Sequence, residues 1–326
     1  MRVETSMLII AFIVSIILGF IIIPILRKLK VGQIERDDGP QSHLKKQGTP
    51  TMGGIIMIIA MIIVVTGAYI FLSMNGSNNI ANKLLPMLIL TIGFGAIGFI
   101  DDFKKLVLKN TKGLKPSYKM LGLLVISVVY VIYLIQLLHL GTETYIPILK
   151  TYIDLPIYIY IPFAILVILG TTNAINLTDG IDGLSSSVCT IIITCLTLIG
   201  VISGIGEVSL FGSIVIGTVL GFLMFNLHPA KVFMGDTGSL LLGGVISAIA
   251  LYLKLPLILL VIALIPVIET ISVIIQVVYF KKTGKRFFKM APLHHHFELE
   301  GWKENKVVIV FSLITLILCV IGLKII

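Results

Sequence analysis

Hydrophobic residues of this chain fall into ten long runs separated by shorter polar segments. The runs show no alternation of apolar and polar positions, so membrane-spanning strands are not expected. A helix needs about 20 apolar residues to cross a bilayer, or somewhat fewer when its ends are polar. The pattern therefore predicts ten transmembrane helices, of which the third and eighth have the least defined boundaries. The runs are Met7–Leu26, Met52–Leu72, Leu85–Ile100, Met120–Leu140, Leu155–Thr172, Leu184–Ile202, Val208–Phe225, Leu240–Leu253, Pro256–Phe280 and Val307–Leu323.

The charges of the connecting segments set the expected orientation. Ten spans place both termini on one side and divide the connections into two sets. One set holds 20 of the 25 Lys and Arg residues, and it comprises Arg27–Thr51, Asp101–Lys119, Asn173–Gly183, Asn226–Ser239 and Lys281–Lys306. Because positive charge marks the cytoplasmic side, we predict an all-α polytopic membrane protein with both termini extracytoplasmic and a site on the cytoplasmic face. The whole chain, 1–326, is expected to form a single integral membrane domain.

The composition agrees with this prediction. Of the 326 residues, 57% are hydrophobic and 13% are charged, whereas a soluble domain has about 25% charged residues. A water-soluble globular protein is therefore excluded. The net charge of +9 follows from the topology and from attraction to anionic lipids and substrates, so no nucleic-acid partner is needed. The three cysteines lie inside apolar runs without a C-x-x-C pair, and neither a disulfide framework nor a zinc site is expected.

Five aspartates lie in the predicted cytoplasmic set, each near the end of a span: Asp101, Asp102, Asp179, Asp182 and Asp236. Carboxylates at the edge of the hydrocarbon are costly unless they are paired, hydrated or bound to a metal. Since the five come from three separate connections, they indicate one shared site. Adjacent residues do not share a helix face, so Asp101 and Asp102 should serve different partners, for example a metal and a proton.

Two further segments carry polar groups at regular spacing. Asn173, Asn176, Asp179 and Asp182 are each three residues apart. In a helix this spacing gives one polar stripe, and the alternative is a turn rich in Asn, Asp and Gly. Asp236 precedes an apolar run, where it could cap a helix, bind magnesium through its carboxylate, or do both.

Three consecutive histidines, His294, His295 and His296, follow a basic and aromatic segment. Neighbouring side chains diverge on a regular backbone, so the three cannot converge on one zinc ion. Hydrogen bonding to phosphate or proton transfer near neutral pH fits them better.

Two weaker signals complete the pattern. Lys45 and Lys46 precede several glycines in the first cytoplasmic connection, which is weak evidence for phosphate binding because the segment does not match the P-loop. Glu269 lies within the ninth run. An acid inside the membrane suggests function, but no second charge is expected at that depth, which favours a structural role against neighbouring helices.

The motifs together resemble the phospho-N-acetylmuramoyl-pentapeptide-transferase family, within the superfamily of polyprenyl-phosphate N-acetylhexosamine-1-phosphate transferases. The resemblance covers nearly the whole chain, and the triple histidine with its flanks is specific to this family. The matching segments are GTPTMGG at 48–54, DDFKK at 101–105, NLTDGIDGL at 176–184, PAKVFMGDTGSL at 229–240 and PLHHHFE at 292–298.

This resemblance implies a Mg²⁺-dependent enzyme of the bacterial cell membrane. It would transfer phospho-N-acetylmuramoyl-pentapeptide from UDP-N-acetylmuramoyl-pentapeptide to undecaprenyl phosphate, giving lipid I and UMP in peptidoglycan synthesis. The resemblance implies Asp236 as the magnesium ligand. It implies as catalytic residues Asp101, Asp102, Lys119, Asn176, Asp179, His294, His295 and His296. It implies as the uridine-binding set Lys46, Gly180, Ile181, Asp182, Asn226 and Phe233, with the Phe233 ring stacked on uracil.

Direct attack of the lipid phosphate, with Asp101 as base, is the expected mechanism, and an aspartyl phospho-enzyme is the rival. Two other functions are weighed. A related N-acetylglucosamine-1-phosphate transferase is disfavoured by PLHHHFE. A transporter is disfavoured because the acids lie at one interface and not at the midplane. The sequence leaves open whether Asp101 or Asp102 takes the proton, and whether the protein forms a homodimer.

Overall fold

The computed structural model describes residues 3–29, 46, 48–106, 108 and 113–326. Within these residues ten helices are long and apolar enough to cross a membrane, which confirms the expected number and the all-α class. They are α1 (Val3–Lys28), α3 (Gly54–Met74), α4 (Asn78–Leu106), α5 (Pro116–Gln136), α6 (Ile157–Thr178), α7 (Leu184–Ile202), α8 (Gly206–Asn226), α9 (Gly235–Tyr252), α11 (Leu264–Thr283) and α13 (Glu304–Ile325).

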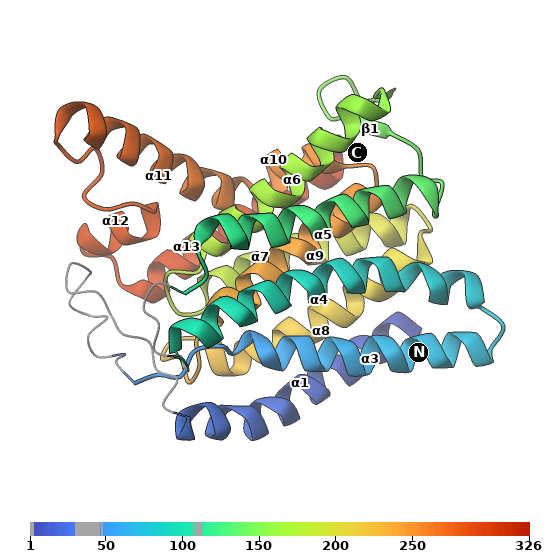
Figure 1. The fold of residues 1–326 in the computed structure, drawn as a ribbon, viewed down its shortest axis with the longest axis horizontal. Coiled ribbons are helices and arrows are strands. Elements are labelled where there is room, and N and C mark those ends of the chain that lie inside the picture. The colour runs from blue at the N-terminus through green and yellow to red at the C-terminus, as the bar shows by residue number, and fades with distance from the viewer. Residues whose placement is uncertain (1–2, 30–45, 47, 107, 109–112) are drawn as a thin grey trace.

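Helices α8 and α9 form the centre of the bundle, and the other spans pack around them (Figure 1). Helix α1 packs along α8, while α4 and α6 pack along α9. Association in a membrane depends on small residues that allow close packing and on hydrogen bonds between helices. One such bond joins α1 to α8, where Ser15 Oγ donates to the carbonyl oxygen of Thr218 at 2.8 Å. The outer helices expose apolar side chains on their other faces, as contact with lipid requires.

The ninth predicted run is not one continuous helix. It consists of the 3-10 turn η1 (Pro256–Ile258), the short α10 (Leu259–Ile262) and α11, with a non-helical Ala263 between the last two. Pro266 lies in the first turn of α11, and it has no N–H to donate to the carbonyl of Ile262, so the helix is interrupted there. Helix α11 then projects away from the bundle and is followed by the short α12 (Leu293–Leu299) (Figure 1).

A small antiparallel hairpin, absent from the sequence-based expectation, joins α5 to α6. It consists of β1 (Glu143–Ile146) and β2 (Thr151–Asp154), with Tyr145 opposite Tyr152. Both strands contain the β-branched and aromatic residues that strands favour. The Tyr145 N–H donates to the carbonyl of Lys254, and its hydroxyl donates to the carbonyl of Ile325. The hairpin is thereby fixed to the bundle end that carries the C-terminus.

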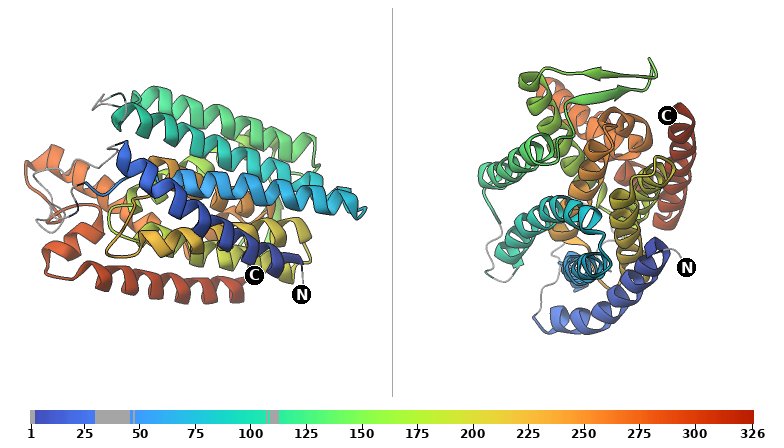
Figure 2. Two further views of the ribbon diagram at one scale, coloured as in Figure 1. Left: turned by 90° about the horizontal axis from the view of Figure 1, so that it is seen from below. Right: turned by 90° about the vertical axis from the view of Figure 1, so that its right-hand side faces the viewer.

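The site residues gather at the opposite end of the bundle. Helices α4, α6 and α8 end there, and α5, α7 and α9 begin there, while both termini lie toward the other end (Figures 1 and 2). Helix α4 extends beyond the predicted Leu85–Ile100, so Asp101 and Asp102 lie in its last turns. Helix α9 begins five residues before the predicted Leu240, which places Asp236 in its first turn.

A candidate active site at one end of the bundle

Asp102 joins the end of α4 to the beginning of α9. Its Oδ2 accepts hydrogen bonds from the N–H and the hydroxyl of Thr237, at 2.9 and 2.6 Å, and its Oδ1 accepts one from the Asp236 N–H at 3.2 Å. The first N–H groups of a helix lack partners within it, and here Asp102 supplies them. Gly98 permits this approach, because a Cβ there would collide with the Asp236 carbonyl. The cap position of α9 is Met234, so the alternative that Asp236 is the helix cap is wrong.

Asp101 and Asp236 face each other across two lysines. Asp236 Oδ2 accepts a hydrogen bond from Lys105 Nζ and another from Lys119 Nζ, both at 3.0 Å. The same ammonium groups lie 2.8 and 3.5 Å from Asp101 Oδ2. Asn176 Nδ2 donates to the second oxygen of Asp236 at 2.8 Å. As predicted, Asp101 and Asp102 serve different partners: Asp101 meets two cations, and Asp102 meets a helix N-terminus.

The predicted polar stripe of α6 is only partly present. The helix ends at Thr178, so Asp179 lies at its C-terminal cap and Asp182 in the following turn. The Asn173 side chain donates back to the carbonyl of residue 169 in its own helix, whereas Asn176 reaches Asp236. The helical alternative is therefore correct for Asn173 and Asn176, and the turn alternative is correct for Asp179 and Asp182.

The carboxyl group of Asp179 is half-buried and forms no hydrogen bond or ion pair with any residue that the structure describes. Burial and the nearby carboxylates of Asp236, Asp102 and Asp182 raise the pKa of Asp179 to about 8. A carboxyl group surrounded by like charges is a natural place for a cation, because a cation would remove this repulsion.

The three histidines have different hydrogen-bond partners, but the prediction that neighbouring histidines diverge is wrong for the first two, since the ring centroids of His294 and His295 lie 4.2 Å apart. His294 is fully buried, and its Nδ1 lies 3.1 Å from Glu269 Oε1. His295 Nδ1 lies 2.9 Å from Glu298 Oε2, and His296 Nδ1 accepts a hydrogen bond from the Lys289 N–H at 3.2 Å. His294 lies against Gly180 in the loop that follows α6.

Glu269 fixes the position of His294. Besides the imidazole contact, its carboxylate accepts the N–H of Leu293 at 2.5 Å and that of His294 at 3.2 Å. These contacts fit the structural role expected of Glu269, although its partners belong to α12 and include a buried imidazole that was not foreseen. The His294 Nε2 has no partner among the described residues and lies against Gly180, where a Cβ would collide with it. Glycine at 180 is thus required for this approach.

The expected uridine-binding residues lie around the ion pair of Lys46 and Asp182, beside the carboxylates of the site. Lys46 Nζ lies 2.7 Å from Asp182 Oδ1 and 6.0 Å from the centre of the half-buried Phe233 ring. The backbone of Phe233 pairs with the first loop, since its N–H donates to Pro50 and its carbonyl accepts from Gly53, both at 2.8 Å. Lys45 lies outside the described residues.

Asn226 and Ile181 have buried positions around this group. The Asn226 amide accepts a hydrogen bond from Ser186 Oγ at 2.6 Å and donates to the carbonyl of Val232 at 3.0 Å. It therefore holds the loop that carries Phe233. Ile181 packs beneath the turn that contains Gly180.

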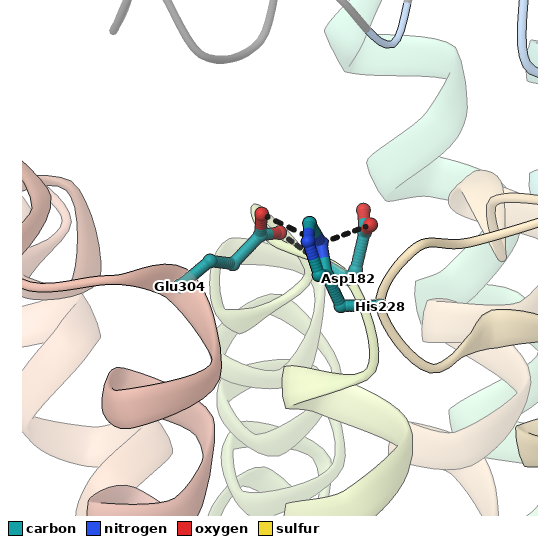
Figure 3. A group of neighbouring side chains, drawn as sticks. All are labelled: Asp182, His228 and Glu304. Carbon is teal, nitrogen blue, oxygen red and sulfur yellow. Dashed lines mark hydrogen bonds and ion pairs between the residues drawn. The ribbon is translucent and has the colours of Figure 1, made fainter.

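Two groups of side chains have the chemistry to hold a cation. Asp179 and Asp236 present carboxylate oxygens, the ligands that Mg²⁺ prefers. Asp182, His228 and Glu304 form the other group, and one potential ligand atom from each lies within 4.8 Å of the others (Figure 3). The second group already contains a cation, because Lys46 Nζ contacts Asp182 and also lies 2.5 Å from Glu304 Oε1.

Three residues at this end, Lys105, His228 and Glu304, were not singled out from the sequence, and for Glu269 the partner was not foreseen. Lys105 had a local signal, because it lies four residues after Asp101 in a helix that ends there. The pairing of Glu269 with His294 joins residues 25 positions apart. For His228 and Glu304 no local pattern exists, since both meet Asp182 only after the loops are folded together.

Comparisons with known proteins agree with this arrangement. Residues 84–254 match the model of the family described as "Glycosyl transferase family 4". The chain is 49% identical to a protein of Clostridium botulinum (strain Alaska E43 / Type E3) over 97% of its own length and 94% of the relative's. It is 50% identical to one of Clostridium perfringens (strain 13 / Type A), over 97% and 96%, and 47% identical to one of Acetivibrio thermocellus, over 96% and 92%.

All three relatives bear the same name, phospho-N-acetylmuramoyl-pentapeptide-transferase. Each match extends over almost the full length of both proteins. With ten apolar helices and its converging carboxylates, this chain belongs to the phospho-N-acetylmuramoyl-pentapeptide-transferase family.

Proposed function

We propose that this chain is a membrane transferase that moves phospho-N-acetylmuramoyl-pentapeptide from its UDP carrier to undecaprenyl phosphate, giving lipid I and UMP. The observation that carries the proposal is the position of Asp236 at the beginning of α9. There it meets Asp101, Lys105, Lys119 and Asn176, which belong to three other segments. Two anionic substrates need such a concentration of cationic groups, because their phosphates repel each other.

The charge distribution supports a cytoplasmic position for this site. The connections at this end carry most of the Lys and Arg residues of the chain, and positive charge marks the cytoplasmic side. The UDP-linked donor is a water-soluble nucleotide, whereas the acceptor is a lipid. A polar site at the end of a helix bundle is open to both phases.

Magnesium fits the residues present. Asp179 has an unpaired carboxyl group beside Asp236, and oxygen ligands from one or two carboxylates with substrate phosphates are typical of Mg²⁺. When bound, Mg²⁺ would offset the negative charge that develops on the phosphates. We assign Asp236 and Asp179 to its binding, with Lys105 and Lys119 as neighbouring cations that contact the same Asp236 oxygen.

Asp101 suits the base better than Asp102. Both carboxylates are buried, and both oxygens of Asp102 accept hydrogen bonds from the start of α9, which commits them to holding that helix. Asp101 instead contacts Lys105 and Lys119. We infer that Asp101 accepts a proton from the lipid phosphate. A phosphate oxygen then bonds to the sugar-linked phosphorus of the donor, and the bond from that phosphorus to the UMP oxygen breaks.

The remaining residues orient the donor. Lys46, Asp182 and Phe233 form one polar and aromatic group suited to uridine, and Asn226 holds the Phe233 loop. His294, which Glu269 positions, presents its free Nε2 beside Gly180. That nitrogen is suited to hydrogen bonding with a donor phosphate.

The test uses the full chain in detergent or in vesicles with Mg²⁺ and undecaprenyl phosphate. Release of UMP is measured with UDP-N-acetylmuramoyl-pentapeptide and, separately, with UDP-N-acetylglucosamine. We expect release with the first donor alone. Equal release with the second would assign the chain to a related sugar-1-phosphate transferase. A covalent phospho-aspartate formed from the donor without lipid would refute direct attack.

A further inference from the structure

Three loops and the first turn of one helix at the polar end meet in one group of charged side chains. Lys46 comes from the first loop, Asp182 from the turn after α6, His228 from the loop between α8 and α9, and Glu304 from the first turn of α13. Three of these side chains appear in Figure 3. Two of them, His228 and Glu304, have no part in the function proposed above.

Glu304 has the most connections in this group. Its Oε1 lies 2.5 Å from Lys46 Nζ and accepts the backbone N–H of Asp182 at 2.6 Å. Its Oε2 lies 3.2 Å from His228 Nδ1. The side chains of Glu304 and Lys46 are 8% and 12% exposed, so their ion pair is shielded from water and stronger than a surface pair, whereas the His228 side chain is 39% exposed.

Asp182 is also held by contacts with the loop between α8 and α9. Besides Lys46, its carboxylate contacts His228 Nδ1 and accepts the N–H of Ala230, both at 3.0 Å. Its side chain is 2% exposed. All four groups therefore depend on one another for their positions, and Lys46 is the member that lies over the Phe233 ring.

The cation that lies within this group is the ammonium group of the Lys46 side chain and not a metal ion. Lys46 Nζ lies between the two carboxylates, 2.7 Å from one and 2.5 Å from the other. Burial lowers the pKa of Lys46, but the hydrogen bonds and charges of Asp182 and Glu304 outweigh this and raise it above its usual value. Lys46 therefore stays protonated and supplies the positive charge that a metal would otherwise bring.

We propose that Glu304, assisted by His228, is a positioning residue for recognition of the nucleotide. It fixes Lys46 and Asp182 so that they and Phe233 present a preformed surface to the uridine diphosphate of the donor. The proposal rests on the proposed function of the site. Because Glu304 begins α13, it also ties the nucleotide loops to the helix that follows the histidine segment.

The test compares Glu304→Gln with the wild type in the full chain. The amide keeps an acceptor for the Asp182 N–H but loses the charge that holds Lys46. We expect the KM for the UDP donor and the Kd for UMP to rise about tenfold, as loss of a hydrogen bond between charged groups produces. The turnover number and the KM for undecaprenyl phosphate should stay unchanged. If Glu304 served only folding, its substitution would not raise the KM for the UDP donor while leaving the turnover number and the KM for undecaprenyl phosphate unchanged.

Glu300→Gln is the matched control. Glu300 lies in the same segment and pairs with Lys289, but both side chains are exposed, and such pairs contribute little. A double variant tests whether Glu304 acts through Lys46. If it does, the variant that combines Lys46→Met with Glu304→Gln should bind UMP no more weakly than Lys46→Met alone.

Additive effects in the double variant, or an unchanged UMP affinity in Glu304→Gln, would overturn the proposal. If Glu304→Gln does not fold, Glu304→Asp retains the charge with a shorter reach and must still weaken UMP binding. A wild type that binds UMP but transfers no muramoyl-pentapeptide would refute the proposed function alone, because the UMP measurement still tests Glu304.

Discussion

Asp102 and Thr237 form a buried pair in which one carboxylate oxygen accepts both the backbone N–H and the hydroxyl of the threonine, at 2.9 and 2.6 Å. The two residues belong to α4 and α9, which pack along each other. The pair fixes the start of α9, and therefore Asp236, with respect to Asp101. Asp102 is in this sense a support for the site, whereas Asp101 faces its cations.

Asp102→Asn should reduce both stability and activity. Asparagine retains only one acceptor oxygen, so an N–H of α9 loses its partner, at a cost of about 1–3 kcal/mol. Thr237→Val, which loses only the hydroxyl donor, should cost about 1 kcal/mol. Thermal unfolding measures both. The control is Thr190→Val, because the Thr190 hydroxyl bonds only to its own helix. If Asp102→Asn unfolds like the wild type, Asp102 has no supporting role.

Asp236→Asn should abolish transfer and alter the dependence on magnesium. The substitution removes the charge that Lys105 and Lys119 share and that we assign to Mg²⁺. We expect turnover to fall about 100-fold or more, as on loss of a single group that stabilises developing charge. Initial rates across a range of Mg²⁺ concentrations give the measurement. Asp154→Asn, an exposed position on the distant hairpin, should leave the rates unchanged. Near-normal turnover in Asp236→Asn would remove it from the metal site.

Gly180→Ala should impair transfer by displacing His294. The added Cβ would collide with the imidazole Nε2, and neither Glu269 nor the buried surroundings of His294 leave it room to move. We expect the turnover number to fall by at least about tenfold, a barrier change of about 1.4 kcal/mol. Gly170→Ala is the control, because that glycine lies in α6 with no atom near its missing Cβ. Equal activities of the two variants would show that the His294 contact is dispensable.

Asp179→Asn should stabilise the metal-free protein as the pH rises. The pKa of Asp179 is about 8 when folded, against 3.8 normally. Between these values the folded state holds a proton that the unfolded state has released, so stability falls as the pH rises toward 8. Asparagine does not titrate, so the stability of the variant does not fall with pH for this reason. With EDTA present, the Tm of Asp179→Asn should exceed that of the wild type by more at pH 8 than at pH 5. A constant difference would mean that the pKa is not raised.

The sequence predicts the spans well because long apolar runs are the strongest signal in a membrane protein. It also places all five aspartates correctly at one end, since each lies beside a run. It misses the interruption at Ala263, although Pro266 is visible in the ninth run, because the run remains apolar throughout. The hairpin of Glu143–Asp154 is missed because its strands are too short to show a period beside the spans.

Pairings between distant segments lie beyond what the sequence predicts. Asp102 and Thr237 are 135 positions apart, and Lys46 and Glu304 are 258 apart. No local periodicity relates such residues, because helix packing decides which ends meet. The family resemblance implies which residues belong to the site, but the structure distinguishes Asp102, which holds the start of α9, from Asp101, which contacts Lys105 and Lys119. It also adds His228 and Glu304 and the partner of Glu269.

Helix α4 has 29 residues and α9 has 18, so at 1.5 Å per residue they measure about 43 and about 27 Å. Asp102 locks the two together at the polar end, and the surplus length of α4 projects with α3 beyond the opposite end (Figures 1 and 2). Since changes in hydrocarbon thickness tilt helices, we expect lipids of different acyl-chain length to displace this far end of α4 more than the end at which Asp102 holds it to α9.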